Sequence, residues 1–516
     1  MDNLPVGGIN DNHMAADPKV LQTYPLDYYY SIIVDLLEPP TSEARPNGGD
    51  EALSLRPVRN FQVGFLHLSE DTFQYLAKKG ALDLLPHGLR NQILRAYVKY
   101  VHPLLPILNM NHFLIEMIIE DDSHTSSPLL YQAVMLAGSA FIDAQDAKEA
   151  GNSSRNELRR MLFERAKLLF ELETETDPYI QIQALLLMTQ WHEGNMSHKN
   201  PQYWLNTACL IAERIGLDEG LESGHLTLNN RIWWSLYVQD RLLSLQFRSR
   251  LRIPDNAFRI SLLKFANMAY EPCHPLATLI LGDDASVVLV SQDIQKQMTK
   301  LFVEEINLAH HIGVLLTYLY DGSWAPSPSR DCKHSLAAKE SLTSTMVYEC
   351  EQALKGWIQG LPGDVGYNPS SGLLNSVVSL TDKSFLTHRA YLYLLYLGAL
   401  CLLYQAGDSK SHLSYPGNSE KLRRVISLAK ATFNDLHQTD LFQFLPGASV
   451  TILTLFLEAI LPDLNETNST LRLEAMWNLY TCEEAASQLI ETHPVAEKLL
   501  LRSQIVRSEI LGLVER

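Results

Sequence analysis

Cysteine is scarce in this sequence, and its cysteines are not clustered. The six cysteines are widely separated, at positions 209, 273, 332, 350, 401 and 482. This spacing offers no CxxC pair, zinc ribbon or compact disulfide framework, because each of these needs cysteines within a few residues of one another. We therefore expect reduced thiols, most of them packed in the interior.

Long hydrophobic runs are also lacking. The strongest apolar run, AYLYLLYLGALCLLY from Ala390 to Tyr404, is shorter than the roughly 20 residues that a membrane span needs. We expect it to form a buried helix and expect no membrane contact. The first residues, MDNLPVGGINDNHM, have neither the basic start nor the apolar core of a secretory signal, which predicts a protein that stays inside the cell.

Basic charge is in deficit. Lysine and arginine together number 42 against 59 aspartates and glutamates, a formal net charge of −17. A chain of this charge is repelled by a phosphate backbone unless a local basic patch overrides the average. The balance therefore disfavours direct binding of nucleic acid.

The motifs of common catalytic and metal sites are missing too. WHEGNMSH, at 191–198, contains His-Glu, but a zincin has its second histidine where this sequence has Met196. The acidic pairs at 121–122 and 283–284 lack the third carboxylate of a DDxxD magnesium motif. No GxGxxG, GxxxxGK[ST] or GxSxG motif occurs. We therefore predict no enzyme activity, no metal site and no cofactor.

What is present is helical periodicity. Apolar residues recur at helical spacing in most of the chain, for example after the S-x-x-E capping box of Ser154 and Glu157. Two helices have clear start signals, a capping residue followed by proline at 177–178 and 200–201, and glycines at 194 and 216 as stop signals. Alternating strand patterns are scarce. The prediction is an all-α fold, a large multi-helix bundle.

Loop-rich stretches divide the chain. Residues 38–60 and 321–334 gather proline, glycine and small polar residues without an apolar period. We expect an N-terminal segment with a flexible linker over 1–60 and a helical core over 61–320. A C-terminal helical region over 335–516 should pack on that core.

One stretch sets charges against large apolar side chains. Residues 231–255 read RIWWSLYVQDRLLSLQFRSRLRIPD, and at helical spacing their apolar residues occupy nearly every side of the helix. A buried Asp240 needs a partner, and Arg250 and Arg252, just past the end of the helix, are candidates. Two interpretations stay open: a buried ion pair that fixes how the next segment folds back, or an arginine that binds a ligand.

This stretch resembles a known family signature. NRIWWSLYVQDRLLSLQFRSRLRIPDNAF is similar to the signature of the fungal-specific transcription factor domain, the middle homology region of zinc-cluster regulators. Its usual form is R-R-x-W-W-x5-D-R followed by G-R-P-x-x-I. Arg248, Ser249 and Arg250 stand where glycine, arginine and proline are commonest. LRAYVKYVHPLLPILNMNHFL, at 94–114, resembles the opening motif of the family, and the nearest branch is that of the cutinase transcription factors.

The resemblance gives a structural signature and a set of expectations. Its residues here are Trp233, Trp234, Asp240, Arg241, Arg250, Arg252, His102 and Pro103. It implies a nuclear transcription regulator that contacts other regulators or coregulators, as a homodimer or heterodimer, and controls a metabolic or biosynthetic gene set. It also implies that a helical groove could sense a small molecule.

The family usually begins with a Zn₂Cys₆ module that places a helix in the DNA major groove. This sequence has no cysteine before Cys209, so we expect contact with DNA only indirectly or weakly. Two alternatives remain open. An upstream exon could supply the zinc cluster, or the chain could be an all-α enzyme or metabolite-binding protein that kept the fold without the regulatory role.

Overall fold

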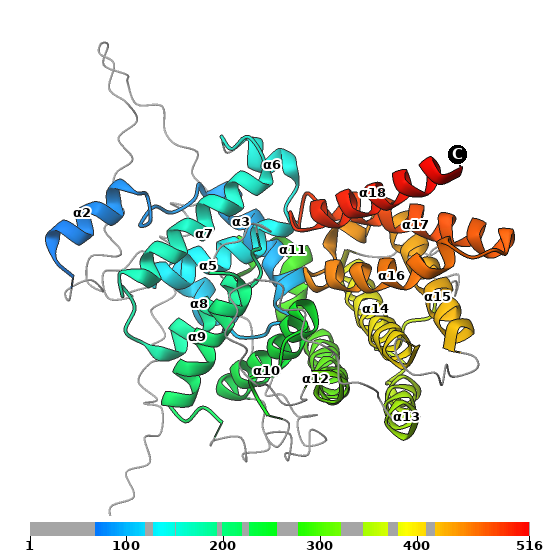
Figure 1. The fold of residues 1–516 in the computed structure, drawn as a ribbon. Coiled ribbons are helices and arrows are strands. Elements are labelled where there is room, and N and C mark those ends of the chain that lie inside the picture. Colours follow the sequence, from blue (N-terminus) through cyan, green and yellow to red (C-terminus); the bar gives the residue numbers. More distant parts are fainter. Residues whose placement is uncertain are drawn as a thin grey trace, which may run out of the picture. The chain divides into compact units, whose positions relative to one another are not determined.

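The computed structural model describes residues 68–118, 127–149, 151–192, 199–218, 227–254, 277–320, 344–369, 380–408 and 418–514. Within these ranges all regular structure is helical and no strand forms (Figure 1). The all-α prediction is therefore confirmed. Residues 57–516 form one compact unit that contains both predicted helical regions, and the predicted boundaries at 60 and 335 stay predictions.

The first helices run to the end of the signature stretch. They are α2 (Glu70–Lys78), α3 (His87–Ala96), α4 (Met110–Ile118), α5 (Pro128–Gly138), α6 (Ala144–Glu149), α7 (Arg155–Glu171), α8 (Pro178–Met188), α9 (Pro201–Arg214) and α10 (Leu228–Phe247). A π-helical turn, Tyr97–Val101, continues α3, and a 3₁₀ turn, Ser139–Phe141, continues α5.

The remaining helices follow the gap after residue 254. They are α11 (Ala277–Val290), α12 (Gln292–Tyr320), α13 (Ser344–Gly360), α14 (Leu380–Asp408), α15 (Asn418–Gln438), α16 (Ala448–Leu464), α17 (Ser469–Leu489) and α18 (Ala496–Val514). A 3₁₀ turn, Phe442–Phe444, lies between α15 and α16.

Capping side chains begin the helices where the sequence predicts. Asp177 accepts a hydrogen bond from the backbone N–H two residues ahead, at 2.8 Å, and Asn200 accepts from the N–H three residues ahead, at 3.0 Å. Pro178 and Pro201 occupy the first helical positions, where a missing N–H costs nothing. Ser154 likewise accepts from the third N–H of α7, at 3.1 Å. These starts are confirmed.

The predicted end of α8 is wrong. The helix ends at Met188, whereas the expected stop signal, Gly194, lies outside the described residues. The hydroxyl of Thr189 donates to the carbonyl of Leu186 at 2.6 Å, which satisfies a carbonyl that another helical turn would have used. The helix therefore ends beside a threonine that bonds back to the main chain, before the glycine is reached.

Helix α14 contains the strongest apolar run. Residues 383–406 are long and apolar enough to cross a membrane, but 89% of the most apolar window is buried inside the protein. Its neighbours are α11, α12, α13, α15 and α16 and the π-helical turn at 97–101. The prediction of a buried helix over Ala390–Tyr404 is confirmed, since burial of this kind is typical of the central helix of a helical domain.

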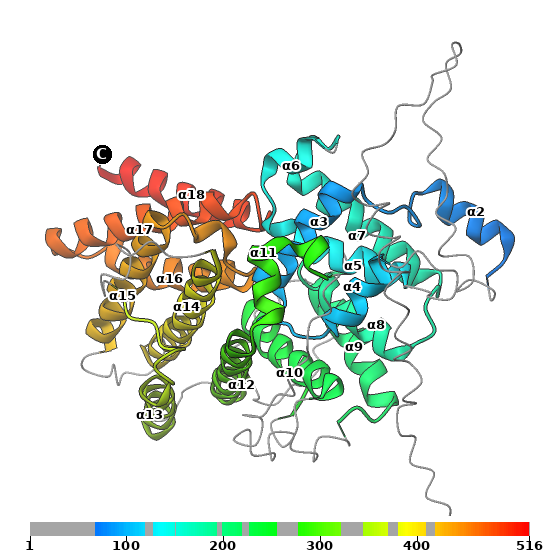
Figure 2. The ribbon, with the colours of Figure 1, turned by 180° about the vertical axis from the view of Figure 1, so that it is seen from behind.

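Helix α10 joins early and late parts of the chain. It packs on α8 and α9 and also on α12 and α16. Figure 2 shows α10 between α9 and α12 from behind. A helix in contact with neighbours on all sides needs apolar residues all round, which explains the lack of a polar face in its sequence.

Candidate functional site

The signature helix α10 is buried on almost every side. From residue 230 to residue 245 only Gln239 is not fully buried. Trp234 has no exposed surface, and Trp233 is 5% exposed. The ring of Trp234 meets that of Tyr237 edge-on, with 5.3 Å between the centroids. The two signature tryptophans therefore pack in the core, as the apolar pattern predicts.

Asp240 is the buried acid of this helix. It is 2% exposed, and the Arg241 guanidinium donates to its Oδ2 at 3.0 Å. The backbone N–H groups of Arg252 and Ile253 also donate to the carboxylate, at 3.1 and 3.0 Å. Burial raises the pKa of Asp240, while Arg241 and these N–H groups act in the opposite direction by stabilising the ionised form. One carboxylate thus ties the segment after α10 back onto the helix.

The partners differ from those expected. Arg250 is exposed, and its carbonyl accepts a hydrogen bond from the Ser244 hydroxyl at 3.2 Å. Arg252 contributes its backbone to Asp240, while its guanidinium forms an ion pair with Glu213 at 3.2 Å. The ion-pair partner is instead Arg241. Adjacent residues on a helix point about 100° apart, so helical spacing alone does not favour Arg241 as the partner of Asp240.

Arg241 is held by more than Asp240. It is fully buried, and its guanidinium carbon lies 3.5 Å from the centroid of the Tyr237 ring. A guanidinium over an aromatic face gains a cation–π interaction, which is strongest where water is excluded. The arrangement of Asp240, Arg241 and Tyr237 supports the interpretation of a structural ion pair.

Arg248 occupies the turn that ends α10. It is left-handed, with φ 49° and ψ 47°, and the N–H of the next residue, Ser249, donates to the carbonyl of Ser244 at 3.0 Å. A left-handed residue favours glycine, the commonest residue here in the resembled signature. The side chain of Arg248 forms an ion pair with Glu458 of α16. The left-handed turn at the end of α10 therefore forms here with an arginine in place of the glycine of the signature.

His102 and Pro103, from the opening motif, lie beside the signature helix. Together with Arg231 of α10 and Phe302 of α12 they line a small cavity of about 40 Å³. Burial and the charge of Arg231 lower the pKa of His102 to about 3, so its imidazole is neutral in the folded protein. The structure brings together two motifs that are far apart in the sequence.

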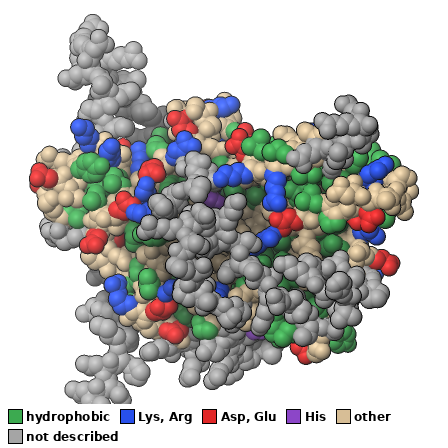
Figure 3. All heavy atoms as spheres, viewed as in Figure 1, with side chains coloured by type: hydrophobic (Ala, Val, Ile, Leu, Met, Phe, Trp, Pro, Cys, Tyr) green, Lys and Arg blue, Asp and Glu red, His purple; other side chains and the backbone are tan. Residues whose placement is uncertain are grey.

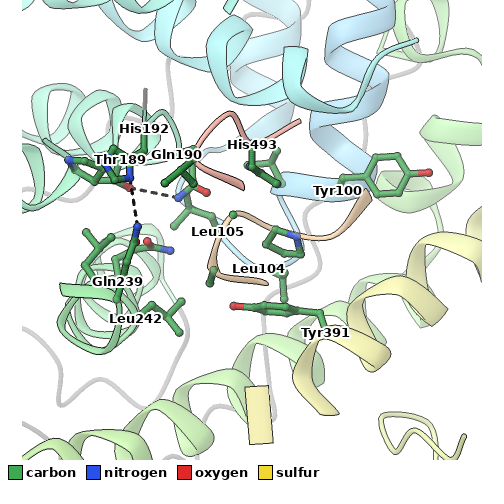
Figure 4. A pocket seen from close by; sticks show the side chains of 18 of the residues that line it. Tyr100, Leu104, Leu105, Thr189, Gln190, His192, Gln239, Leu242, Tyr391 and His493 are labelled. Atoms are coloured by element: carbon green, nitrogen blue, oxygen red, sulfur yellow. Dashed lines mark hydrogen bonds between the residues drawn. The ribbon is translucent and has the colours of Figure 1, made fainter. Parts of the chain in front are cut away.

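A second cavity, of about 80 Å³, lies between the early and late helices (Figure 4). Its lining includes residues of α7, α10, α12 and α14, the segment that follows α8, and residues 446–448 and 493–495. The close-up shows Gln239 and Leu242 of α10 on one side and Tyr391 of α14 below, with its hydroxyl turned toward the α10 side chains. We call this space the central cavity.

Glu305 of α12 lines the central cavity. It is 2% exposed, its Oε2 is without a hydrogen-bond partner, and no ion pair joins it to another described residue. Burial raises its pKa well above the usual value. Sequence analysis missed it, although a signal existed: Glu305 lies in helical register with the apolar residues Leu301, Leu308 and Ile312.

Arg159 and His493, which also line the central cavity, are engaged by other groups of the protein. The Arg159 guanidinium donates to the carbonyls of Thr492 and Gln190 and lies over the Trp191 ring. Burial is the main cause that lowers the pKa of Arg159, to about 9. His493 shares a hydrogen bond of 2.9 Å with a backbone carbonyl, and its pKa is lowered to about 3, chiefly by burial.

Metal-binding geometry is not found in the part of the chain that the structure describes, where no three histidine, cysteine or acidic side chains gather. The vicinal pair His310 and His311 has ring centroids 5.6 Å apart, and the hydroxyl of Tyr237 lies 3.2 Å from the first ring. The four described cysteines are buried free thiols.

Comparison with known proteins finds a family match in the earlier part of the chain. Residues 94–280 match the family described as the fungal specific transcription factor domain. This part of the chain is similar to that domain. The match includes both motifs, from the opening histidine and proline to the Trp-Trp and Asp-Arg pairs of α10. No solved structure matches the chain significantly.

Curated relatives of the domain are named as transcription factors. Cutinase transcription factor 1 beta of Fusarium vanettenii is 27% identical over 456 residues, which cover 83% of this chain and 50% of that protein. Transcription factor cpaR of Aspergillus oryzae is 29% identical over 74% of this chain and 65% of its own length. The Fusarium oxysporum f. sp. lycopersici fusaric acid cluster transcription factor FUB12 is 27% identical over 41% of this chain and 32% of its own length. The chain thus spans about half the length of the first relative.

The central cavity extends beyond the matched domain. Its α10 wall belongs to residues 94–280, whereas Glu305, Tyr391 and His493 come from later helices and turns. The region that matches the fungal transcription factor domain therefore supplies part of the cavity, and later helices and turns complete it.

Proposed function

We propose that this chain regulates transcription in the nucleus through contacts of its helical domain with other transcription regulators or coregulators. The observation that carries the proposal is the match of residues 94–280 to the fungal transcription factor domain, with the signature helix buried at the junction of early and late helices. The three relatives described above are named as transcription factors, which supports the same role.

The genes under control are proposed to be metabolic or biosynthetic. Two relatives carry cutinase and the fusaric acid cluster in their names, and a shorter match is to the acetamidase regulatory protein of Aspergillus oryzae. The similarity over most of this chain is to the first of these. We extend this class of target, rather than any individual target, to the present chain.

Contact with DNA is proposed to be indirect, through a homodimer or heterodimer partner. The net charge of −17 opposes a phosphate backbone. On the face seen in Figure 3, acidic and basic side chains of the described residues are interspersed rather than gathered into one basic field. A partner that binds DNA would place this domain at a promoter, and the domain itself would then need no basic surface.

A tethered reporter assay tests the regulatory role. The whole chain is fused to an unrelated DNA-binding domain, and transcription from a reporter with the matching site is measured in a fungal host. We expect the fusion to change reporter output several-fold relative to the DNA-binding domain alone. Arg250→Ala, which alters an exposed side chain, serves as the matched control and should behave as the unaltered chain. A folded, nuclear fusion with no effect on output would refute the role.

Binding of a metabolite is the second candidate function, and the central cavity is the observation that favours it. We propose that it belongs to the same protein as an effector site. The cavity is formed by helices from both halves of the compact unit, so a bound ligand would stabilise one arrangement of those halves. Thermal unfolding with and without ligand measures that effect directly.

A further inference from the structure

A carboxyl group without a partner lies inside the central cavity. The neighbours of Glu305 on its helical face, Leu301, Leu308 and Ile312, are at most 1% exposed, so this face of α12 is otherwise apolar. The described residues supply neither a hydrogen bond to its Oε2 nor a cation paired with it. Buried carboxyl groups in folded proteins are ordinarily paired or hydrogen-bonded, so the Glu305 carboxyl lacks the partner that such a group usually has.

Packing alone does not account for a glutamate here. A leucine or methionine would fill the same space with no cost of desolvation, and replacing a buried charge by an apolar residue is often neutral or stabilising. A perturbed carboxyl in a cavity, by contrast, is a common feature of sites that meet a ligand. The missing partner is therefore expected to come from outside the protein.

The charges of the cavity favour a cation. Glu305 is the one carboxyl among the residues that line it. The Arg159 guanidinium already donates to two backbone carbonyls, and His493 is neutral and bonded to a third. His192 shares a hydrogen bond with Gln246, and its pKa is lowered chiefly by burial. A ligand anion would therefore find no uncommitted cation and would meet the Glu305 carboxyl. A protonated amine would instead supply the positive charge that Glu305 lacks among the described residues.

Other groups suit the remainder of a small amine. The amide of Gln239 makes no hydrogen bond to a described residue, and the Tyr391 hydroxyl is turned toward α10. Leu104 and Leu242 add apolar surface. Since a single water needs at least about 10–15 Å³ of such space, about 80 Å³ admits roughly half a dozen non-hydrogen atoms.

We propose that the central cavity binds a small organic amine whose protonated nitrogen pairs with the Glu305 carboxylate. The apolar part of the amine lies against the leucines, and the cavity amides take any further polar atoms. This inference rests on the proposed effector site and names its ligand class. Binding is measured on the purified chain, without transcription, so its failure is distinguishable from failure of the reporter assay.

The test compares ligands of equal size and different charge. Isoamylamine, isoamyl alcohol and isovalerate, and the n-butyl series of the same three groups, are titrated into the whole chain by calorimetry. We expect the amines to bind about ten-fold more tightly than the alcohols, because only they form an ion pair, and to raise the melting temperature. The carboxylates should bind least.

Two variants decide whether Glu305 is the cause. Glu305→Gln keeps the shape of the side chain, removes its charge and should abolish the preference for amine over alcohol. Glu304→Gln is the matched control, because that neighbouring carboxyl bonds to Asn307 and Trp357 and does not line the cavity. This control should keep the preference. Absence of amine binding at millimolar concentration, equal binding of amine and alcohol, or a preference that survives in Glu305→Gln would overturn the proposal.

Discussion

At the scale of single residues, Asp240 organises the end of the signature helix. Its carboxylate receives the Arg241 guanidinium and two backbone N–H groups from a segment twelve and thirteen residues further on. Such a group stabilises the fold through its donors, because each donor would otherwise lie buried without an acceptor. Its removal therefore costs more than one ion pair.

Asp240→Leu should lower the free energy of unfolding by about 3–5 kcal/mol, since Arg241 would be left as an uncompensated buried charge. Urea unfolding followed by tryptophan fluorescence measures the change. The double variant Asp240→Leu with Arg241→Met should recover part of the loss, because both charges are then gone. A single variant as stable as the unaltered chain would show that the ion pair is not structural.

Arg248 allows a test of backbone strain. Arg248→Ala and Arg248→Gly both lose the ion pair with Glu458, but only glycine adopts the left-handed conformation without steric cost. We expect the glycine variant to be more stable than the alanine variant by about 1 kcal/mol in urea unfolding. Equal stability of the two would contradict a strained turn at this position.

The sequence predicted part of the site and missed part of it. Helical spacing was enough to bury α10 and to show that Asp240 needed a partner. The choice of Arg241 depended on how the guanidinium folds over Tyr237, which is tertiary information. Glu305 was missed because a single acid within an apolar face is usually interpreted as solvent-exposed. The cavity that it lines is completed by α14 and by the turns after α15 and α17, which is tertiary information.

At the scale of elements, local signals fixed the starts of helices better than their ends. Side-chain caps at Ser154, Asp177 and Asn200 act within a few residues and are legible in the sequence. The end of α8 was not legible in the same way: the helix stops at Met188, beside the back-bonded Thr189 hydroxyl and before the glycine that marked the expected end. Which helices pack against each other, in contrast, depends on how their side chains fit together where the helices cross.

The crossing of α3 and α5 depends on a glycine. A Cβ atom on Gly138 would lie 2.6 Å from the carbonyl oxygen of Ile93, closer than real contacts allow. Gly138→Ala should therefore destabilise the protein by roughly 1–3 kcal/mol, although alanine is the better helix former. In the exposed control Gly356→Ala, a Cβ meets nothing within 4 Å, and we expect a gain of up to about 1 kcal/mol. Thermal unfolding of both variants measures the difference, and a stabilised Gly138→Ala would refute the close crossing.

At the scale of the whole molecule, buried histidines couple stability to pH. Burial is the largest cause that lowers the pKa of His102 and His493 to about 3 and that of His388 to about 4. Between these values and the unfolded value of 6.5 the unfolded chain binds more protons than the folded one, so stability falls as the pH falls. Glu305 acts in the opposite direction, because its raised pKa favours the folded state at low pH.

We expect the free energy of unfolding to decrease between pH 7 and pH 5, by up to about 1.4 kcal/mol per pH unit for each histidine. Urea midpoints at a series of pH values measure the slope. His388→Gln should reduce the slope even if it lowers stability at every pH, which separates titration from packing. A slope that is zero in this range would contradict neutral, buried imidazoles.

The central proposal at this scale is that the chain acts on transcription through protein surfaces and that a partner contacts the DNA. A gel-shift of the purified chain on promoter fragments, at about 150 mM salt, tests it most directly, because affinity for DNA depends on salt as well as on sequence. The account predicts no specific complex with the chain alone. A complex that survives an excess of unrelated DNA would contradict it.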